Sequence, residues 1–304
     1  MNKNTGLTKH ACSLCGASLR PSRYRKGKFR LWVCDRCVFG QIYPRPSFEE
    51  VDKCYRLGYS EGSYEKVLEL GRQVKRDKFK RILLLLRRMG IVKNLKRESV
   101  LDLGCSDGLF LEMVREMGGI DFVGVELADE GAQRAAELLG KEKVFHGKVE
   151  EYTGRAERTF SLVTMLDLIE HVEDLDFFMA SVLGLLRRKG TLVITTPNWR
   201  CLYARLFGSR WPYFIPPEHL LYFSPRAMYS FGAKFGLEVL LIRRAVKYVS
   251  LRYFTGVAEH LAPFLAGPGR LILECLPFGW ENRSIPLYLG ETLAVFRKSE
   301  NSVF

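Results

Sequence analysis

Residues 100–108 read VLDLGCSDG, an apolar run that leads directly into a turn carrying Gly104 and Gly108. The residues after this turn have the spacing of a helix, and Gly118-Gly119 suits the end of that helix. A glycine turn between a strand and a helix lets backbone N–H groups approach a nucleotide-like ligand closely. Because such turns are common, the motif alone does not identify a ligand.

A second feature strengthens this interpretation. Glu126 ends the next apolar run, 22 residues after Gly104. An acidic residue at the end of the second strand can accept hydrogen bonds from both hydroxyl groups of a ribose. Together the turn and the acid predict an adenosine-containing ligand. The alternative is a tight turn that only connects strand and helix, with Glu126 as an unrelated surface residue.

The rest of the chain after residue 97 alternates between short apolar runs and helical patterns. Strands are expected at 99–103, 122–126, 143–146, 160–166, 191–196, 237–243 and 288–297, and helices over 129–139 and 174–188. This alternation favours a parallel sheet covered by helices on both faces. The expected fold class is therefore α/β: a Rossmann-like, seven-stranded, mostly parallel sheet in a catalytic domain over residues 98–304.

Four of the eight cysteines form two C-x2-C pairs separated by 18 residues: Cys12, Cys15, Cys34 and Cys37. This spacing is typical of a zinc ribbon, in which four thiolates complete a closed tetrahedral site, so the zinc would be structural. The alternative is four unligated thiols. Residues 1–60 are expected to form this ribbon and a Pro-rich connector, and a basic amphipathic linker helix is expected over 61–97.

Positive charge is concentrated at the front of the chain. Residues 1–97 contain 24 Lys and Arg against 8 Asp and Glu, within a net charge of +13 for the whole chain. We expect the apolar stripe of the linker helix to pack on the catalytic domain and its cations to face outward. Such a face can attract nucleic acid, anionic lipid or a phosphorylated acceptor, or it is simply solvated.

Hydrophobic residues make up 47% of the chain, which is ordinary for a globular protein. No apolar run reaches the ~18 residues of a spanning helix, and residues 1–16 lack the apolar core of a signal peptide. The chain is therefore expected in the cytoplasm, in solution or at the inner face of the membrane. The apolar segment 251–280 is expected to pack on the core, or else to form a cap facing a membrane or a substrate.

Two histidines are candidates for catalysis. His171 follows the fourth strand, at the sheet edge where open α/β sheets bind ligands, although it could instead only fix the following turn. His219 lies within WPYFIPPEHLLYF, residues 211–223, after the fifth strand. This proline-stiffened aromatic segment is either a substrate lid or a loop packed on the core.

These features together resemble a known family. The stretches LDLGCSDGLF, GVEL, LDLIEHVED and LLRRKGTLVITTPN are similar to class I S-adenosylmethionine-dependent methyltransferases, in particular the ubiquinone-biosynthesis type. The pattern CSLCG…CDRCVFGQIYPRPSFEEVDKCY also resembles bacterial methyltransferases that carry a zinc ribbon ahead of this domain. Many of those enzymes act in sugar, surface-polysaccharide or natural-product pathways.

The resemblance implies a set of cofactor contacts. Asp102 and Gly104 would lie at the methionine end of S-adenosylmethionine, and Glu126 would hold the ribose. The remaining contacts would come from Cys105, Ser106 and Gly108 in the turn, Leu127 and Val149 around the adenine, and Asp167 closing the pocket. Ser106 replaces a glycine common in the family, which is tolerable if its φ is negative. Lys148-Val149 replaces an acid on the adenine amino group, so that contact would come from the backbone.

The resemblance also implies the reaction, in which the enzyme aligns an acceptor with an already activated methyl group. The expected function is O- or C-methylation of a small-molecule, glycan-pathway or lipid-pathway acceptor. An RNA methyltransferase whose basic front grips phosphates is the alternative. It is less favoured because Leu166-Asp167-Leu168-Ile169 stands where base N-methyltransferases carry an Asp-Pro-Pro-Tyr-type motif. A non-enzymatic binding module is disfavoured by the retained turn and Glu126.

Overall fold

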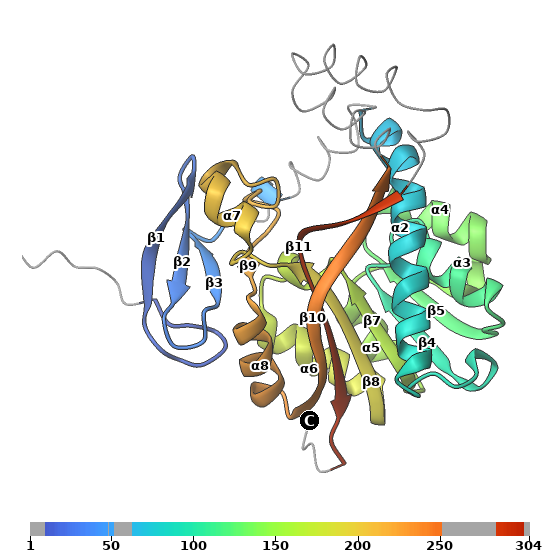
Figure 1. The fold of residues 1–304 in the computed structure, drawn as a ribbon. Helices are drawn as coiled ribbons and strands as arrows, with labels where there is room; N and C mark the ends of the chain where they lie inside the picture. Colours follow the sequence, from blue (N-terminus) through green and yellow to red (C-terminus); the bar gives the residue numbers. More distant parts are fainter. Residues whose placement is uncertain (1–9, 48, 52–62, 251–283, 301–304) are drawn as a thin grey trace, which may run out of the picture.

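The computed structural model describes residues 10–47, 49–51, 63–250 and 284–300, arranged around two β-sheets (Figure 1). Residues 52–60, at the end of the connector, lie outside this range, and so does the whole apolar segment 251–280. Among the described residues, no helix is both long enough and apolar enough to cross a bilayer.

The larger sheet has seven strands in the order β10-β11-β8-β7-β4-β5-β6. Their bounds are β4 (Ser99–Leu103), β5 (Asp121–Glu126), β6 (Val144–His146), β7 (Phe160–Leu166), β8 (Leu186–Pro197), β10 (Leu237–Ser250) and β11 (Ser284–Lys298). All neighbours from β6 to β8 pair in parallel, and β11 runs antiparallel to both β8 and β10. The expected seven-stranded, mostly parallel sheet is thereby confirmed.

Helices cover both faces of this sheet, as expected. One face packs against α2 (Ser63–Arg88), α3 (Leu109–Glu116) and α4 (Asp129–Leu139), which share an apolar core with Val100, Leu162 and Val193. The other face packs against α5 (Val149–Arg155), α6 (Leu175–Leu185) and α8 (Pro225–Lys234), around Leu101, Val163 and Ile194. Successive residues of each strand therefore point to opposite faces of the sheet and pack into two separate cores.

Two elements end elsewhere than the sequence predicts. The linker helix stops at Arg88, not at residue 97, because Gly90 takes a left-handed φ of 70° and the N–H of Ile91 donates to the Leu86 carbonyl at 3.0 Å. This is the helix-terminating pattern that glycine favours. Helix α6 ends at Leu185, and β8 already begins at Leu186, where it pairs with Phe160 of β7. Only the short 3-10 turn Leu95–Arg97 follows α2 before β4.

The smaller sheet has four strands in the order β1-β2-β3-β9. Strands β1 (Leu19–Lys26), β2 (Phe29–Cys34) and β3 (Gly40–Tyr43) come from the cysteine-rich front, whereas β9 (Leu221–Tyr222) directly follows the segment with His219. Figure 1 shows β9 between the front sheet and the main sheet, beside the short helix α7 (Leu202–Phe207). The front and the segment after β8 therefore share one sheet.

Candidate functional site

The two central strands of the main sheet define where a ligand can bind. β4 lies between β5 and β7, so the chain leaves its carboxyl end toward one side of the sheet and later returns on the other. In open α/β sheets such a switch of direction leaves a crevice beyond the carboxyl ends of the strands. The glycine turn, Glu126 and Asp167 all stand at this edge, at the ends of β4, β5 and β7.

Every second residue of the glycine turn has a left-handed backbone conformation: Gly104 (φ 68°), Ser106 (φ 50°) and Gly108 (φ 78°). A Cβ atom on Gly108 would lie 3.2 Å from the Ala135 Cα, so glycine allows α3 to begin directly against α4. Ser106 does not meet the condition stated from the sequence, since its φ is positive. Its backbone N–H donates to the Glu126 carboxylate at 2.7 Å, a charge-assisted bond that offsets the strain of a left-handed serine.

Glu126 receives two backbone hydrogen bonds. Oε2 accepts from Ser106 N at 2.7 Å, and Oε1 accepts from Ala128 N at 2.8 Å. A carboxylate offers about four lone-pair positions, so each oxygen can still accept a hydroxyl hydrogen. The carboxylate therefore stands fixed at the end of β5, with its geometry set before any ligand arrives.

Asp102 has a different environment. Its side chain is buried between β4 and β7, and Oδ1 accepts a hydrogen bond from Thr164 Oγ1 at 2.5 Å. Burial raises the pKa of Asp102 to about 7, although the bond from Thr164 lowers it. The carboxyl group thus faces the sheet interior, and its contribution at the crevice edge is to hold β4 and β7 in register.

The other predicted cofactor residues lie along the same edge. Leu127 directly follows Glu126 and is 61% exposed, so its apolar surface is accessible to a flat ring. Val149 is buried at the start of α5. Cys105 turns its thiol into the core, where a Cβ on Gly124 would come within 2.6 Å of Sγ. Only the backbone of Cys105 therefore remains for a ligand.

Asp167 stands at the exposed end of an ion-pair network that the sequence did not reveal, in which Lys78 and Glu291 are buried. Lys78 Nζ of α2 donates to Asp167 Oδ2 at 2.6 Å and lies 2.9 Å from Glu291 of β11, which also pairs with Lys247. The side chain of Asp167 is 43% exposed, and although its partial desolvation raises the pKa, the ammonium groups of Lys78 and Lys247 hold that pKa well below its usual range. Thr195 Oγ1 donates to the other oxygen at 2.8 Å. The network ties α2 to the crevice edge.

The expectation that the cations of the linker helix face outward is therefore wrong for several of them. Lys78 is 5% exposed, since it falls at core spacing between Val74 and Ile82. Arg72 pairs with Asp107 of the glycine turn and with Glu112, at 2.9 and 3.3 Å, while Arg76 pairs with Glu112 and Glu116 at 3.1 and 2.7 Å. The position of Lys78 within the apolar stripe of the helix was the one feature of the sequence that could have indicated its burial. These cations fix α2 on α3.

The two candidate catalytic histidines meet, although 48 positions separate them in the sequence. Their rings lie edge to face with centroids 4.7 Å apart. Nδ1 of His171 lies 3.1 Å from the Glu218 carbonyl, and Nδ1 of His219 lies 2.9 Å from the Tyr213 carbonyl. A carbonyl partner places the proton on Nδ1, so a neutral ring carries its lone pair on Nε2.

Burial sets the charge of this histidine pair. It lowers the pKa of His171 to about 4 and the pKa of His219 to about 3. Both rings are therefore neutral near pH 7. The neighbouring Glu170 is also buried, which raises its pKa well above the usual value. Donor atoms of Glu170, His171 and His219 lie within 4.8 Å of one another, a set that could also hold a divalent ion.

The segment around His219 is packed, not open. Trp211, Phe214, Tyr222 and Phe223 are almost fully buried, as is the His219 side chain. Of the two readings of residues 211–223, the structure favours the loop packed on the core. The N–H of Leu220 donates to the Glu170 carbonyl at 2.7 Å, which joins this segment to the loop after β7.

The four front cysteines converge as their spacing predicts. Their Sγ atoms are separated by 3.5 Å (Cys12–Cys37), 3.5 Å (Cys15–Cys34) and 3.6 Å (Cys15–Cys37). A tetrahedral zinc site with Zn–S bonds of about 2.3 Å requires sulfurs about 3.8 Å apart, so the geometry fits. The hydrogen bond between the two thiols lowers the pKa of Cys12 and raises that of Cys37, so this pair favours a single thiolate at Cys12.

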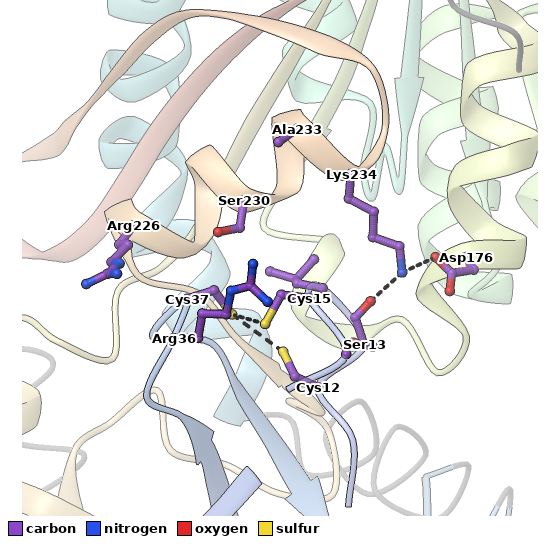
Figure 2. A pocket seen from close by; sticks show the side chains of 12 residues that line it. Cys12, Ser13, Cys15, Arg36, Cys37, Asp176, Arg226, Ser230, Ala233 and Lys234 are labelled. Atoms are coloured by element: carbon purple, nitrogen blue, oxygen red, sulfur yellow. Dashed lines mark hydrogen bonds and ion pairs between the residues drawn. The ribbon is translucent and has the colours of Figure 1, made fainter. Parts of the chain in front are cut away.

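A groove of about 790 Å³ separates this cysteine cluster from α8 (Figure 2). Figure 2 shows Lys234 of α8 reaching across it to Asp176 and to the Ser13 carbonyl. Arg36 and Arg226 also line the groove. A zinc ion with four thiolates carries a net charge of about −2. The three cations and Asp176 would balance that charge, so with zinc bound the groove would have no excess positive charge to attract an anion.

Comparison with known protein families identifies the domain that contains this crevice. A family model described as "Methyltransferase domain" matches residues 70–242, more than half of the chain. The chain belongs to this methyltransferase family. The match runs from α2 through the crevice-forming strands to β10. Family membership assigns this domain to the methyltransferases that use S-adenosylmethionine, and it confirms the resemblance read from the sequence.

Two curated relatives of this methyltransferase are ubiquinone biosynthesis O-methyltransferases. The protein from Rhizobium etli is 32% identical over 102 residues, which cover 33% of this chain and 41% of the relative. The mitochondrial protein from Schizosaccharomyces pombe is 29% identical over 140 residues, which cover 44% and 48%. The matched part is thus less than half the length of either relative.

Among solved structures, a magnesium protoporphyrin IX methyltransferase from Synechocystis PCC 6803, with bound SAH, has a TM-score of 0.51 to this methyltransferase. The likeness covers 82% of this chain and 100% of that chain at 10% identity. At this identity it shows the fold alone. It agrees with the expected α/β architecture.

Proposed function

We propose that this methyltransferase transfers the methyl group of S-adenosylmethionine to a hydroxyl oxygen of a small molecule. The observation that carries the proposal is the contact between the neutral imidazoles of His171 and His219, beside the loop that follows β7, with His171 the more accessible of the two. A hydroxyl acceptor must lose a proton as the methyl group arrives, and an Nε2 lone pair can accept it. The printed names of the two curated relatives, both O-methyltransferases, support the same acceptor atom.

In this proposal the cofactor lies along the ends of β4, β5 and β6. The backbone of Gly104, Cys105, Ser106 and Gly108 lines the methionine side, and Asp102 supports that turn from inside the sheet. Glu126 accepts hydrogen bonds from the two ribose hydroxyls. Leu127 and Val149 flank the adenine, and Asp167 closes the pocket. When bound, S-adenosylmethionine supplies the activated methyl group, while the protein aligns the acceptor with it.

The acidity of the acceptor can also be inferred. An imidazole with a pKa near 3 or 4 is available as a base at neutral pH, but it is a weak base. It suits a hydroxyl that is already acidic, such as a phenol with a pKa of about 10, better than an aliphatic alcohol. We therefore favour a phenol-like acceptor over a sugar hydroxyl or a carbon atom.

The cysteine cluster is proposed to bind structural zinc through Cys12, Cys15, Cys34 and Cys37. Four thiolates leave no position for water, so the metal takes no part in methyl transfer. The remaining exposed cations of α2, including Lys80, Arg87 and Arg88, are the proposed contact for an anionic membrane surface or a phosphorylated acceptor. The RNA alternative is not favoured, since the curated relatives carry the names of small-molecule methyltransferases.

The test of this proposal is methyl transfer to a panel of phenols and aliphatic alcohols, followed by mass spectrometry, across pH 5 to 8. Because the base is neutral above its pKa of about 3 to 4, its protonation should not slow the reaction in this range. We expect phenol methylation without an acid limb near the ordinary imidazole pKa of about 6.5. A rate that falls tenfold per pH unit below about 6.5 would contradict a base of lowered pKa. Methylation of alcohols alone would contradict the preferred acceptor.

A further inference from the structure

The cysteine-rich front, residues 10–47, forms a backbone-paired contact with the methyltransferase domain at β9. Gly40 and Gln41 of β3 pair antiparallel with Tyr222 and Leu221 of β9. The N–H of Ile42 donates to the Leu220 carbonyl at 3.0 Å, directly after His219. The segment that carries the proposed base is therefore a strand-edge partner of the front.

A second contact starts at the cysteine cluster itself. Val38 follows Cys37 and takes a left-handed φ of 59°, a conformation that is unfavourable for a β-branched residue. Its carbonyl accepts a hydrogen bond from Trp199 Nε1 at 3.1 Å. The corresponding residue after Cys15 is Gly16, which adopts φ 71° without strain. The strained knuckle is thus the one that contacts the segment after β8.

The two contacts converge on β9 and Phe223, which directly follow the segment with His219. Asn198 pairs with Phe223, and Trp199 N donates to the Phe223 carbonyl at 3.2 Å. Phe223 in turn packs on Phe39 of the front, with ring centroids 4.9 Å apart. β9 therefore lies between the front sheet and the end of β8, and His219 stands two residues before it. Neither contact involves the glycine turn or Glu126.

We propose that the zinc-bound front is a positioning element for the proposed base: zinc fixes the strained Val38 knuckle, and β3 and Trp199 transmit that position to His219. The inference rests on the proposed function, because it takes His219 as the base and the cysteine cluster as a zinc site. Reacting groups must be held within about 0.5 Å of their productive geometry, so a loosened β9 would displace His219 from the acceptor hydroxyl. The glycine turn and Glu126, the proposed cofactor contacts, would keep their geometry.

The first experiment removes zinc from the full chain with a chelator, with loss verified by elemental analysis. We expect amide hydrogen exchange over residues 213–223 to rise at least about tenfold, because opening of this segment becomes easier. Carbethoxylation of His219 should also rise, exchange over β7 should rise less than exchange over 213–223, and the affinity for S-adenosylhomocysteine should stay within about twofold. Adding zinc back should restore both signals. Unchanged exchange over 213–223 after verified zinc loss would overturn the proposal, and so would equal loosening of β7.

The second experiment keeps the zinc and weakens the contacts. Trp199→Phe removes the donor to Val38, and Gly40→Ala adds a Cβ that would lie 2.7 Å from Leu31 Cδ1 and 3.2 Å from Tyr222 Cβ. Tyr24→Phe is the matched control for the first, since it removes a 2.8 Å bond from the front to the Ala204 carbonyl of α7. Gly154→Ala, with no atom within 4 Å of the new Cβ, is the control for the second.

Only the two test variants should loosen residues 213–223, with zinc content unchanged. If the control variants raised amide exchange over 213–223 equally, or the test variants did not raise it, the proposed route from the front through Trp199 and β3 to this segment would be contradicted. Failure of the proposed function is separate: if His219→Ala leaves methyl transfer intact while zinc removal still loosens the segment, His219 is not the base but the front still positions β9.

Discussion

Replacing His219 with alanine should lower the rate of methyl transfer by roughly 100-fold or more, the usual contribution of a general base. The affinity for S-adenosylhomocysteine should remain nearly unchanged, because the proposed cofactor contacts, the glycine turn and Glu126, lie at the ends of other strands. The measurement is a comparison of turnover on a phenolic acceptor with calorimetric binding of the cofactor product.

A second variant separates the base from a structural role. His219→Asn retains an N–H that can donate to the Tyr213 carbonyl, which His219 Nδ1 contacts at 2.9 Å, but it removes the Nε2 lone pair. If His219 acts as the base, the asparagine variant should be as slow as the alanine variant. Recovery of turnover by asparagine would show that the ring only holds the segment in place.

Removal of the proposed zinc should have the other large effect. Structural zinc sites contribute on the order of 10 kcal/mol to the folding of small zinc modules. Cys37→Ser should therefore abolish stoichiometric zinc binding and lower the melting temperature markedly, since Cys12, Cys34, Cys37 and Phe39 belong to the same apolar core as α6 and α8. The measurements are elemental analysis and thermal unfolding of the full chain.

Cys201→Ser is the matched control for this experiment. Cys201 is also buried, but it lies outside the cluster and caps α7, where its Sγ accepts from Ala204 N at 3.3 Å. Serine is a favoured residue at such a cap. Zinc content and melting temperature should stay close to the wild type. If Cys37→Ser behaves like Cys201→Ser, the cluster holds no stabilising metal.

The sequence predicted the central strands well because each is a short apolar run bounded by turn residues. The range 160–166 matches β7, and 129–139 matches α4. The start of β8 was missed because residues 186–190, LRRKG, carry three charges, although pairing with β7 makes them a strand. β9 has only two residues, and its partner β3 is remote in sequence, so no local pattern could reveal it.

The site was predicted in part for similar reasons. The glycine turn and Glu126 belong to one local strand–helix–strand unit, and their contact follows from it. The pairing of Lys78 with Asp167 joins residues 89 positions apart, and the meeting of His171 with His219 depends on how two loops pack. The left-handed φ of Ser106 was not foreseen because its compensation, the bond to Glu126, is a tertiary contact.

The measurement that tests the central claim most directly is calorimetric binding of S-adenosylhomocysteine to the wild type, to Glu126→Ala and to Asp102→Ala. We predict binding by the wild type and a loss of roughly 1–3 kcal/mol in Glu126→Ala, because two charge-assisted hydrogen bonds to the ribose are removed. Asp102→Ala should also weaken binding, since it removes the 2.5 Å bond from Thr164 that joins β4 to β7 just before the glycine turn. No binding by the wild type, or binding unchanged in both variants, would contradict the assignment of this crevice as the cofactor site.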